Sequence, residues 1–162
     1  MRRTRFTDWP CSVARTVDLV GDWWTPLVLR ECFYGVRRFE DFQRRLRIGR
    51  NILAERLTRL VDEGMLTRRP YQERPVRHEY VLTDKGRDFF PVMVAVMRWG
   101  DRWLADEAGP PITLHHETCD HDTEAEVVCS HCREPLTLRS VRARPGPGLS
   151  APPPASAPAH DR

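Results

Sequence analysis

The residues of this chain best suited to chemistry are cysteines and histidines gathered near its carboxyl end. Residues 112–142 hold three of the five cysteines and four of the six histidines. Four of these residues form two pairs, with two residues inside each pair and nine between the pairs: His116 and Cys119, then Cys129 and Cys132. Three thiolates and one imidazole are a ligand set that suits tetrahedral zinc. The spacing therefore predicts a structural zinc site.

A small ribbon-like β-hairpin would position these ligands. We expect a strand from Ile112 and a returning strand over residues 126–128. Such a module has little hydrophobic core, so the metal would supply its folding free energy, ~10–16 kcal/mol in peptide systems. His121 is an alternative fourth ligand, and His115 and His131 are weaker ones. The other interpretation is a reduced hairpin that holds no metal.

Two enzymatic interpretations of the same residues fit less well. The run "HHE" before a Cys-x2-Cys pair imitates the zinc deaminase signature, but eleven residues separate Glu117 from Cys129 and no proline precedes that cysteine. Thioredoxin-like chemistry needs the cysteine pair at the start of a helix that follows a strand. Here Pro135 comes three residues after Cys132, and no βαβ pattern is present. We predict that the protein is not an enzyme.

Arginine is concentrated in the middle of the chain, although the formal net charge is only +3. From Arg37 to Arg77 there are twelve arginines against six acidic residues, and Lys85 is the only lysine of the chain. Codon bias in a GC-rich genome could explain arginine in place of lysine, but not this concentration. A basic stripe of this kind is typical of proteins that bind nucleic acid.

Helical periodicity surrounds the basic stripe. Apolar residues at helical spacing predict four helices between Val13 and Gly64. Asp22 is suited to cap the second helix, and Gly35 to end it. The fourth helix is "RNILAERLTRLVDEG", and its leucines form one apolar stripe.

A two-stranded hairpin and a long last helix follow. Residues 66–71 and 78–82 are expected to be strands, joined by the turn "QERPVR". Thr83 is expected to cap a single long fifth helix that ends at "AGPP", residues 108–111.

Three helices followed by a hairpin are the order of a winged helix-turn-helix, so the predicted fold is mainly α with a small β-wing. The segment "RIG" between the third and fourth helices is short enough for the turn. In such proteins the second helix of the pair enters the DNA major groove, and the hairpin reaches the neighbouring backbone or minor groove.

The residues expected to contact DNA lie on the fourth helix and around it. If its leucines face the core, the outward face carries Asn51, Glu55, Thr58 and Arg59, with Arg50 at the entering end. Asparagine and arginine can make bidentate contacts with adenine and guanine. The residues placed to contact phosphates are Arg37, Arg38 and Arg47 beside the helix and Arg74 and Arg77 at the wing tip.

These segments also carry a family resemblance. The runs "CSVARTVDLVGDWWTPLVLRECFYGVRRFEDFQRRL", "NILAERLTRLVDEGML" and "RRPYQERPVRHEYVLTDKG" closely resemble HxlR-type winged-helix transcriptional regulators, from Cys11 to about Leu104. The resemblance implies a dimeric DNA-binding regulator, most often a repressor, that dimerises through its first and last helices. Two positions depart from the family pattern: Gly49 stands where Ser or Thr usually caps the recognition helix, and His78 replaces an apolar residue of the wing.

The resemblance further implies a role for Cys11, because several family members carry a cysteine there that senses quinones, aldehydes or oxidants. A helix amino terminus favours the reactive thiolate, and Arg15 lies one turn further on. The effector would then be an oxidant or another small molecule. The other interpretation of Cys11 is a small buried apolar residue, and Cys32, on the core face of the second helix, is expected to be structural.

A homodimer is also indicated by the last helix itself. Its apolar face, which includes Phe89, Phe90, Trp99 and Trp103, is wider than a small winged-helix core can cover. A two-fold dimer predicts an inverted-repeat operator with half-sites about one or two helical turns apart.

The predicted organisation has three parts: a DNA-binding and dimerisation domain over residues 1–108, a Cys/His-rich module over 109–142, and a disordered Pro/Ala-rich tail over 143–162. The sequence has neither the run of ~20 apolar residues needed for a membrane helix nor the apolar core of a secretory signal near its start. We expect a cytoplasmic protein. The alternative function is a winged helix that binds another protein, with a zinc ribbon as the partner surface.

Overall fold

The computed structural model describes residue 6 and residues 8–149. They fall into two compact units: one contains the described residues up to Leu19 together with those from Val128 onward, and the other is Val20–Val127. Helix α1 (Ser12–Val20) belongs almost entirely to the first unit. The predicted domain boundaries stay a prediction. The disorder predicted for the tail falls mostly on residues 150–162, which lie outside the described residues.

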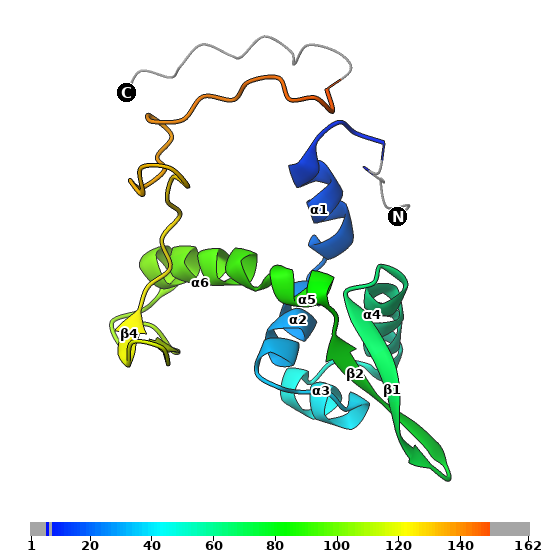
Figure 1. Cartoon of the computed structure of the whole chain (residues 1–162). Coiled ribbons are helices and arrows are strands. Elements are labelled where there is room, and N and C mark those ends of the chain that lie inside the picture. Colours follow the sequence, from blue (N-terminus) through cyan, green and yellow to red (C-terminus); the bar gives the residue numbers. More distant parts are fainter. Residues whose placement is uncertain (1–5, 7, 150–162) are drawn as a thin grey trace. The chain divides into compact units, whose positions relative to one another are not determined.

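Three helices build the core of the second unit (Figure 1). They are α2 (Thr25–Phe33), α3 (Phe39–Leu46) and α4 (Arg50–Asp62), and all three contact one another. The stripe of leucines predicted for the fourth helix is buried. The side chains with no more than 1 % of their surface exposed include Val28, Leu29, Phe42, Leu53, Leu57 and Leu60. Burying each such side chain contributes about 1.5–3 kcal/mol, which fixes the polar face of α4 outward.

The ends of α2 follow the chemistry predicted for them. The Asp22 carboxylate accepts hydrogen bonds from the backbone N–H groups of Trp24 and Thr25, both at 2.9 Å. It thereby satisfies donors that a helix start leaves unpaired. Burial raises the pKa of Asp22, but hydrogen bonds from Thr25 and Trp24 outweigh this effect and hold the pKa below its usual value. Gly35 follows the helix at φ +80°, a conformation that glycine adopts without steric cost.

The wing is longer than predicted. It consists of β1 (Leu66–Glu73) and β2 (Val76–Leu82), paired antiparallel, with only Arg74 and a cis Pro75 between them. The predicted turn "QERPVR" is too long, because Gln72 and Glu73 pair with Arg77 and Val76 and extend both strands toward Pro75. Most of the hairpin projects into solvent, so charged side chains do not prevent its strands from pairing.

The single long fifth helix predicted from Thr83 is wrong, because the structure has two helices there. Thr83 does cap α5 (Asp84–Asp88), its hydroxyl accepting a hydrogen bond from the N–H of Gly86 at 3.1 Å. A second helix, α6 (Phe90–Leu104), follows after a break at Phe89. Pro91 explains the break, since its ring lacks an N–H and collides with the preceding helical turn. None of the helices among the described residues is long and apolar enough to cross a membrane.

The predicted ribbon strands are also corrected. The strand β3 (Leu114–His116) pairs with β4 (His121–Thr123), so the chain returns five residues earlier than expected. Asp120 adopts φ +56° and turns the chain back directly after Cys119. Residues 124–127 form no strand, and Val128 makes an isolated bridge with Pro135.

One buried ion pair joins α2 to α3. Glu31 is only 2 % exposed, and its carboxylate accepts hydrogen bonds from the guanidinium groups of Arg30, at 2.6 Å, and of Arg45. Burial raises the pKa of Glu31, but these two partners outweigh it and hold the pKa below the usual 4.5. A lowered folded-state pKa means that this stabilisation is complete above about pH 4.5 and is lost as the pH falls through the folded-state value.

Gly86 fits closely against the wing, and its replacement by alanine is expected to destabilise the protein strongly. A Cβ atom at this position would lie 2.2 Å from the carbonyl oxygen of Met65 and 3.0 Å from Cδ2 of Leu82. Because the carbonyl is backbone, α5 would have to move away from β1. We expect Gly86→Ala to lose about 3 kcal/mol of unfolding free energy, which lowers the melting temperature by roughly 6–12 °C.

Gly100→Ala is the matched control for this prediction. Gly100 lies inside α6, and no described atom would come within 4 Å of a Cβ at this position. Alanine is therefore expected to stabilise the helix by up to about 1 kcal/mol. Thermal unfolding by circular dichroism measures the melting temperature of both variants. Gly86→Ala should melt below the parent and Gly100→Ala slightly above it, and equal melting temperatures would contradict the close contact at Gly86.

Candidate nucleic-acid interface

The turn between α3 and α4 is held by one buried side chain and one left-handed residue. Arg47 ends α3 with φ +52°, and Ile48, 3 % exposed, packs into the core. Gly49 then precedes α4 without a side-chain cap, as its missing side chain predicts. Three residues thus join the two helices, and the short connection fixes the direction of α4 relative to α3.

The outward face of α4 carries the predicted recognition residues. Asn51, Glu55 and Thr58 are exposed, and Arg50 is exposed at the first position of the helix. The guanidinium of Arg50 lies 5.2 Å from the ring centre of Phe39, the first residue of α3. This contact restricts the cation to the helix start, where phosphates of a bound duplex would lie. Arg59 is only half-buried and takes part in a contact with the rest of the protein.

Arg56 was not among the predicted residues, and its role in the structure is to support the helix. Its guanidinium forms ion pairs with Asp22, at 3.0 Å, and with Glu55, at 2.7 Å. The contact with Asp22 ties α4 to the start of α2, and the contact with Glu55 orients a side chain on the recognition face. Arg56 lies at the border of α4 between the buried face, which carries Leu53 and Leu57, and the outward face. Helical spacing alone therefore assigns it to neither face.

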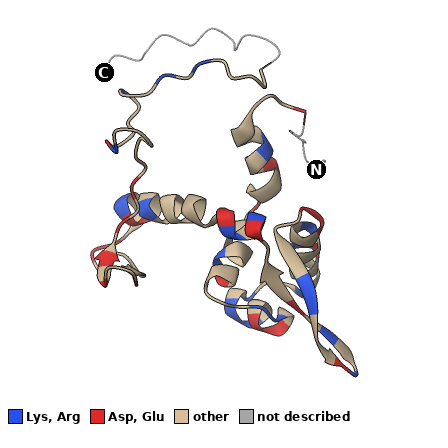
Figure 2. Ribbon diagram, in the orientation of Figure 1, with Lys and Arg blue, Asp and Glu red and all other residues tan. Residues whose placement is uncertain are grey.

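The wing adds more arginines than were predicted. Arg74 and Arg77 are exposed at its tip, as expected, and Arg68 and Arg69 are exposed further down β1. Arg68 and Arg69 are adjacent in the run "TRRPY", a signal that we use only to predict a strand. Basic residues mark both α3 and the hairpin in Figure 2, and on the wing they extend from the tip down β1 to Arg68.

Arg37 and Arg38 connect the helices to the wing through backbone and ring contacts. The N–H of Tyr80 donates to the carbonyl of Arg37 at 2.8 Å, and Arg38 forms a β-bridge with Glu79. The Arg38 guanidinium lies 4.5 Å from the ring centre of Tyr71, the extra residue in the β1 register. A shallow depression of about 480 Å³ beside them is lined by four arginines, Arg37, Arg38, Arg44 and Arg45.

Comparison with known proteins agrees with this geometry. The HxlR-like helix-turn-helix family matches residues 19–108, which is more than half of the chain. The chain belongs to the HxlR-like family. It is a DNA-binding transcriptional regulator of the winged-helix type, and the predicted mainly α fold with a small β-wing is confirmed.

Individual relatives of this HxlR-like regulator extend beyond the winged helix. The uncharacterized HTH-type transcriptional regulator Mb3122 of Mycobacterium bovis is 49 % identical over 140 residues, covering 86 % of this chain and 89 % of its own. The crystal structure of PA1607, a candidate transcription factor, is 34 % identical with a TM-score of 0.78, covering 87 % of this chain and 99 % of its own. The oxidised form of the redox regulator HypR is 30 % identical with a TM-score of 0.53, covering 57 % of this chain and 96 % of its own.

The first predicted ligand pair of the HxlR-like chain lies in the β3–β4 turn. The N–H groups of Cys119 and Asp120 both donate to the carbonyl of His116, at 3.2 and 3.0 Å. Nδ1 of His116 lies 3.2 Å from Sγ of Cys119. The turn therefore brings the imidazole and the thiol of this pair together.

The second pair lies in a turn of the same kind. The N–H of Arg133 donates to the carbonyl of Cys129 at 3.0 Å, and Arg133 adopts φ +63° just as Asp120 adopts +56°. Backbone N–H groups of Cys132 and His131 also donate to the Cys129 thiol and lower its pKa. Such donors stabilise the thiolate, which is the form that binds metal.

The two pairs belong to different compact units of the structure. Among the described residues, no three His, Cys, Asp or Glu side chains come close enough together to hold a metal ion. The zinc site therefore stays a prediction.

The two remaining cysteines differ in environment. Cys11 directly precedes α1, and its thiol accepts a hydrogen bond from the N–H of Ala14 at 3.4 Å. Cys32 is 7 % exposed in the core, where burial and the nearby Glu31 charge raise its pKa to about 12. The structural role predicted for Cys32 fits this environment, since a thiol with so high a pKa is protonated at neutral pH.

Proposed function

We propose that the protein is a homodimeric repressor that binds an inverted-repeat operator through α4 and the wing. The observation that carries the proposal is that nine of the ten predicted contact residues are exposed, on α4, at its entering end, just before α3 and on the wing. Arginines on the helix and on the hairpin can then contact phosphates on both sides of the major groove, while Asn51 faces the bases.

The test of this proposal is genome-wide mapping of bound sites, followed by measurement of affinity at several salt concentrations. An inverted repeat with half-sites one or two helical turns apart is expected. Because about six to eight phosphates would be neutralised, affinity should fall roughly a thousandfold or more between 50 and 200 mM salt. A winged helix that binds another protein would have no specific DNA site and would not show this steep fall of DNA affinity with salt.

The proposal of a dimer rests on an apolar stripe along α6. Val92, Val96, Trp99 and Trp103 follow one another at helical spacing and are 45–63 % exposed. None of the fifteen residues of α6 is buried. An apolar helix of this length gains most of its stability from packing of that face, and a second copy of the chain supplies the surface. Helix α1 also exposes Val13 and Val17.

We further propose that the Cys/His module binds one structural zinc ion through His116, Cys119, Cys129 and Cys132. The support is that each pair sits in a turn closed by a hydrogen bond from the N–H of the residue after the second ligand to the carbonyl of the first ligand. In both turns the residue after the second ligand is left-handed. The same local geometry at both pairs suits two halves of one tetrahedral site better than two unrelated loops.

Cys129→Ser is expected to release the zinc. Elemental analysis of the purified protein should find zinc in stoichiometric amount in the parent chain and in Cys11→Ser, which removes a cysteine outside the ligand set. The Cys129 variant should retain little metal, and its Cys/His module should unfold, because the metal supplies most of the folding free energy of the module. A folded parent protein without metal would contradict the proposal.

The last part of the proposed function is redox sensing by Cys11. Its thiol lies at the start of α1, where N–H groups favour a negative charge, and the similar structures include redox regulators in oxidised and reduced forms. Diamide or a quinone is expected to lower the operator affinity of the parent protein and to leave Cys11→Ala unchanged. An equal response of both proteins would place the sensor elsewhere.

A further inference from the structure

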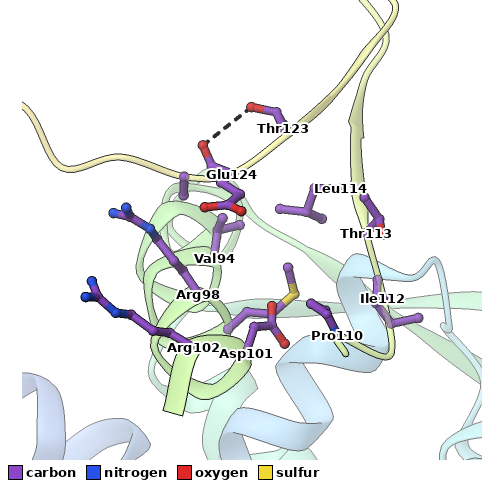
Figure 3. A pocket seen from close by; sticks show the side chains of 12 residues that line it. Val94, Arg98, Asp101, Arg102, Pro110, Ile112, Thr113, Leu114, Thr123 and Glu124 are labelled. Carbon is purple, nitrogen blue, oxygen red and sulfur yellow. Dashed lines mark hydrogen bonds between the residues drawn. The ribbon is translucent and has the colours of Figure 1, made fainter. Parts of the chain in front are cut away.

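A cavity of about 490 Å³ lies between α6 and the segment that carries the β3–β4 hairpin (Figure 3). Its walls come from two parts of one compact unit, Val94 to Arg102 on the helix and Pro110 to Ala125 on the hairpin segment. The volume is within the range of sites that hold drug-sized molecules, about 300–1,000 Å³. The DNA-binding residues do not contribute to it.

One part of the cavity is apolar. Its lining includes Val94 and Met97 from α6 and Ile112 and Leu114 from the hairpin segment. Figure 3 shows Val94 on the helix across from Leu114. These side chains can cover the hydrocarbon body of a ligand and remove its apolar surface from water.

Two arginines form the opposite side. Arg98 and Arg102 are one helical turn apart on α6, and their side chains extend in the same direction in Figure 3. Neither forms an ion pair with another residue of the part of the chain that the structure describes. In this they differ from Arg30, Arg44, Arg56 and Arg87, which are paired with carboxylates at 2.5–3.0 Å. The guanidinium of Arg102 lies 5.1 Å from the ring centre of Trp103, a contact that leaves its N–H donors unused. Two adjacent guanidinium groups offer the parallel donors that a carboxylate accepts in bidentate form.

The charges of the other lining residues restrict the ligand. Asp101 points away from the two guanidinium groups, and Glu124 lies across from them on the hairpin segment (Figure 3). With these two carboxylates the lining is neutral in sum, so a polyanion such as a nucleotide is disfavoured. A single carboxylate at the arginines and an apolar body beside Val94 match the distribution of charge.

Four of the five α6 residues that line the cavity lie on the side of the helix opposite to the proposed dimer stripe. The lining residues Val94, Met97, Arg98 and Asp101 are spaced at i, i+3, i+4 and i+7, two residues out of step with the stripe that begins at Val92. At 3.6 residues per turn, an offset of two residues places the two sets on opposite faces. A ligand beside Val94, Met97 and Arg98 would therefore leave the dimer stripe free, whereas Arg102 adjoins the stripe, its guanidinium lying 5.1 Å from the ring centre of Trp103.

We infer that this cavity binds a small monocarboxylic acid with a hydrophobic body, held by Arg98 and Arg102, and that its occupancy regulates operator binding. The regulatory part rests on the proposed function, whereas the binding part does not. The ligand contacts α6 and the hairpin segment together, so it favours the arrangement in which the two are packed against each other.

The binding test uses 4-phenylbutyrate as the probe and the uncharged 4-phenylbutyramide as its matched control. Isothermal titration of the full chain is expected to show saturable binding of the acid with Kd below about 1 mM, and at least tenfold weaker binding of the amide. The double variant Arg98→Gln and Arg102→Gln should lose the preference for the acid. Arg142→Gln, which removes an exposed arginine outside the cavity, should keep it.

Each outcome bears on one part of the inference. Absence of saturable binding, or equal affinity for acid and amide, overturns the site, and melting temperatures of the variants show whether they are folded. Saturable binding with no change in operator affinity overturns the regulatory part and leaves the site. The titration is performed without DNA, so it tests the ligand site independently of DNA binding. A protein that binds no DNA would therefore contradict the proposed function and not the ligand site.

Discussion

Replacing Arg50 by glutamate is expected to lower operator affinity by about 100-fold at physiological salt. Arg50 is exposed at the first position of α4, and its cation is restricted by the ring of Phe39. The variant removes one phosphate contact and places a negative charge against the DNA backbone, so binding should weaken by a similar factor for every duplex. The slope of log affinity against log salt should become shallower by about one to two. Fluorescence anisotropy over a range of salt concentrations measures both quantities.

Arg142→Glu is the control for net charge. It changes the charge of the chain by the same amount at an exposed position far from α4 in the sequence. Its operator affinity should stay within about threefold of the parent, because exposed charges beyond a Debye length of ~8 Å are screened. If both variants weaken binding equally, the effect is one of net charge and α4 is not the recognition helix. If neither does, the alternative of a protein-binding winged helix gains support.

The helices that present this surface were predictable because their burial pattern is periodic. Leu53, Leu57 and Leu60 repeat at helical spacing, so the buried face of α4 and the outward position of Asn51 follow from the sequence. Arg56 shows the limit of this reasoning. Its role depends on Asp22, which lies thirty-four residues earlier, and periodicity carries no information on a contact across that distance.

The wrong predictions fell where a local signal competed with packing. The apolar spacing from Phe89 onward suggested one helix, but it could not show that the chain bends before Pro91 so that Phe90 packs on Phe33 with ring centres 5.1 Å apart. The returning strand of the Cys/His module begins earlier in the structure than predicted, because strand propensity favours the valines near residue 127. The chain reverses earlier, in a turn closed by backbone hydrogen bonds to the carbonyl of His116 and by the left-handed Asp120, and strand propensity carries no information on such a turn.

The second large effect is expected at the dimer stripe. Replacing Trp99 by glutamate should convert the protein to monomers at micromolar concentration. Trp99 is 59 % exposed in the single chain and lies between Val96 and Trp103 on the apolar face of α6. In a two-fold dimer the same substitution occurs on both protomers. Loss of a central tryptophan costs about 2–4 kcal/mol per site, so the dimer dissociation constant should rise roughly a thousandfold or more.

Light scattering coupled to size exclusion measures this change, and Leu138→Glu is its matched control. Leu138 is 97 % exposed outside α6, so an apolar-to-acidic change there should leave the dimer intact. The Trp99 variant should retain the melting behaviour of the winged-helix core, because its side chain is not part of that core. It should still bind a single half-site weakly but lose preference for the inverted repeat, since two half-sites are read together only by a dimer. A parent protein that is monomeric at these concentrations would contradict the proposed dimer, and a Trp99 variant that remains dimeric would exclude the α6 stripe as its interface.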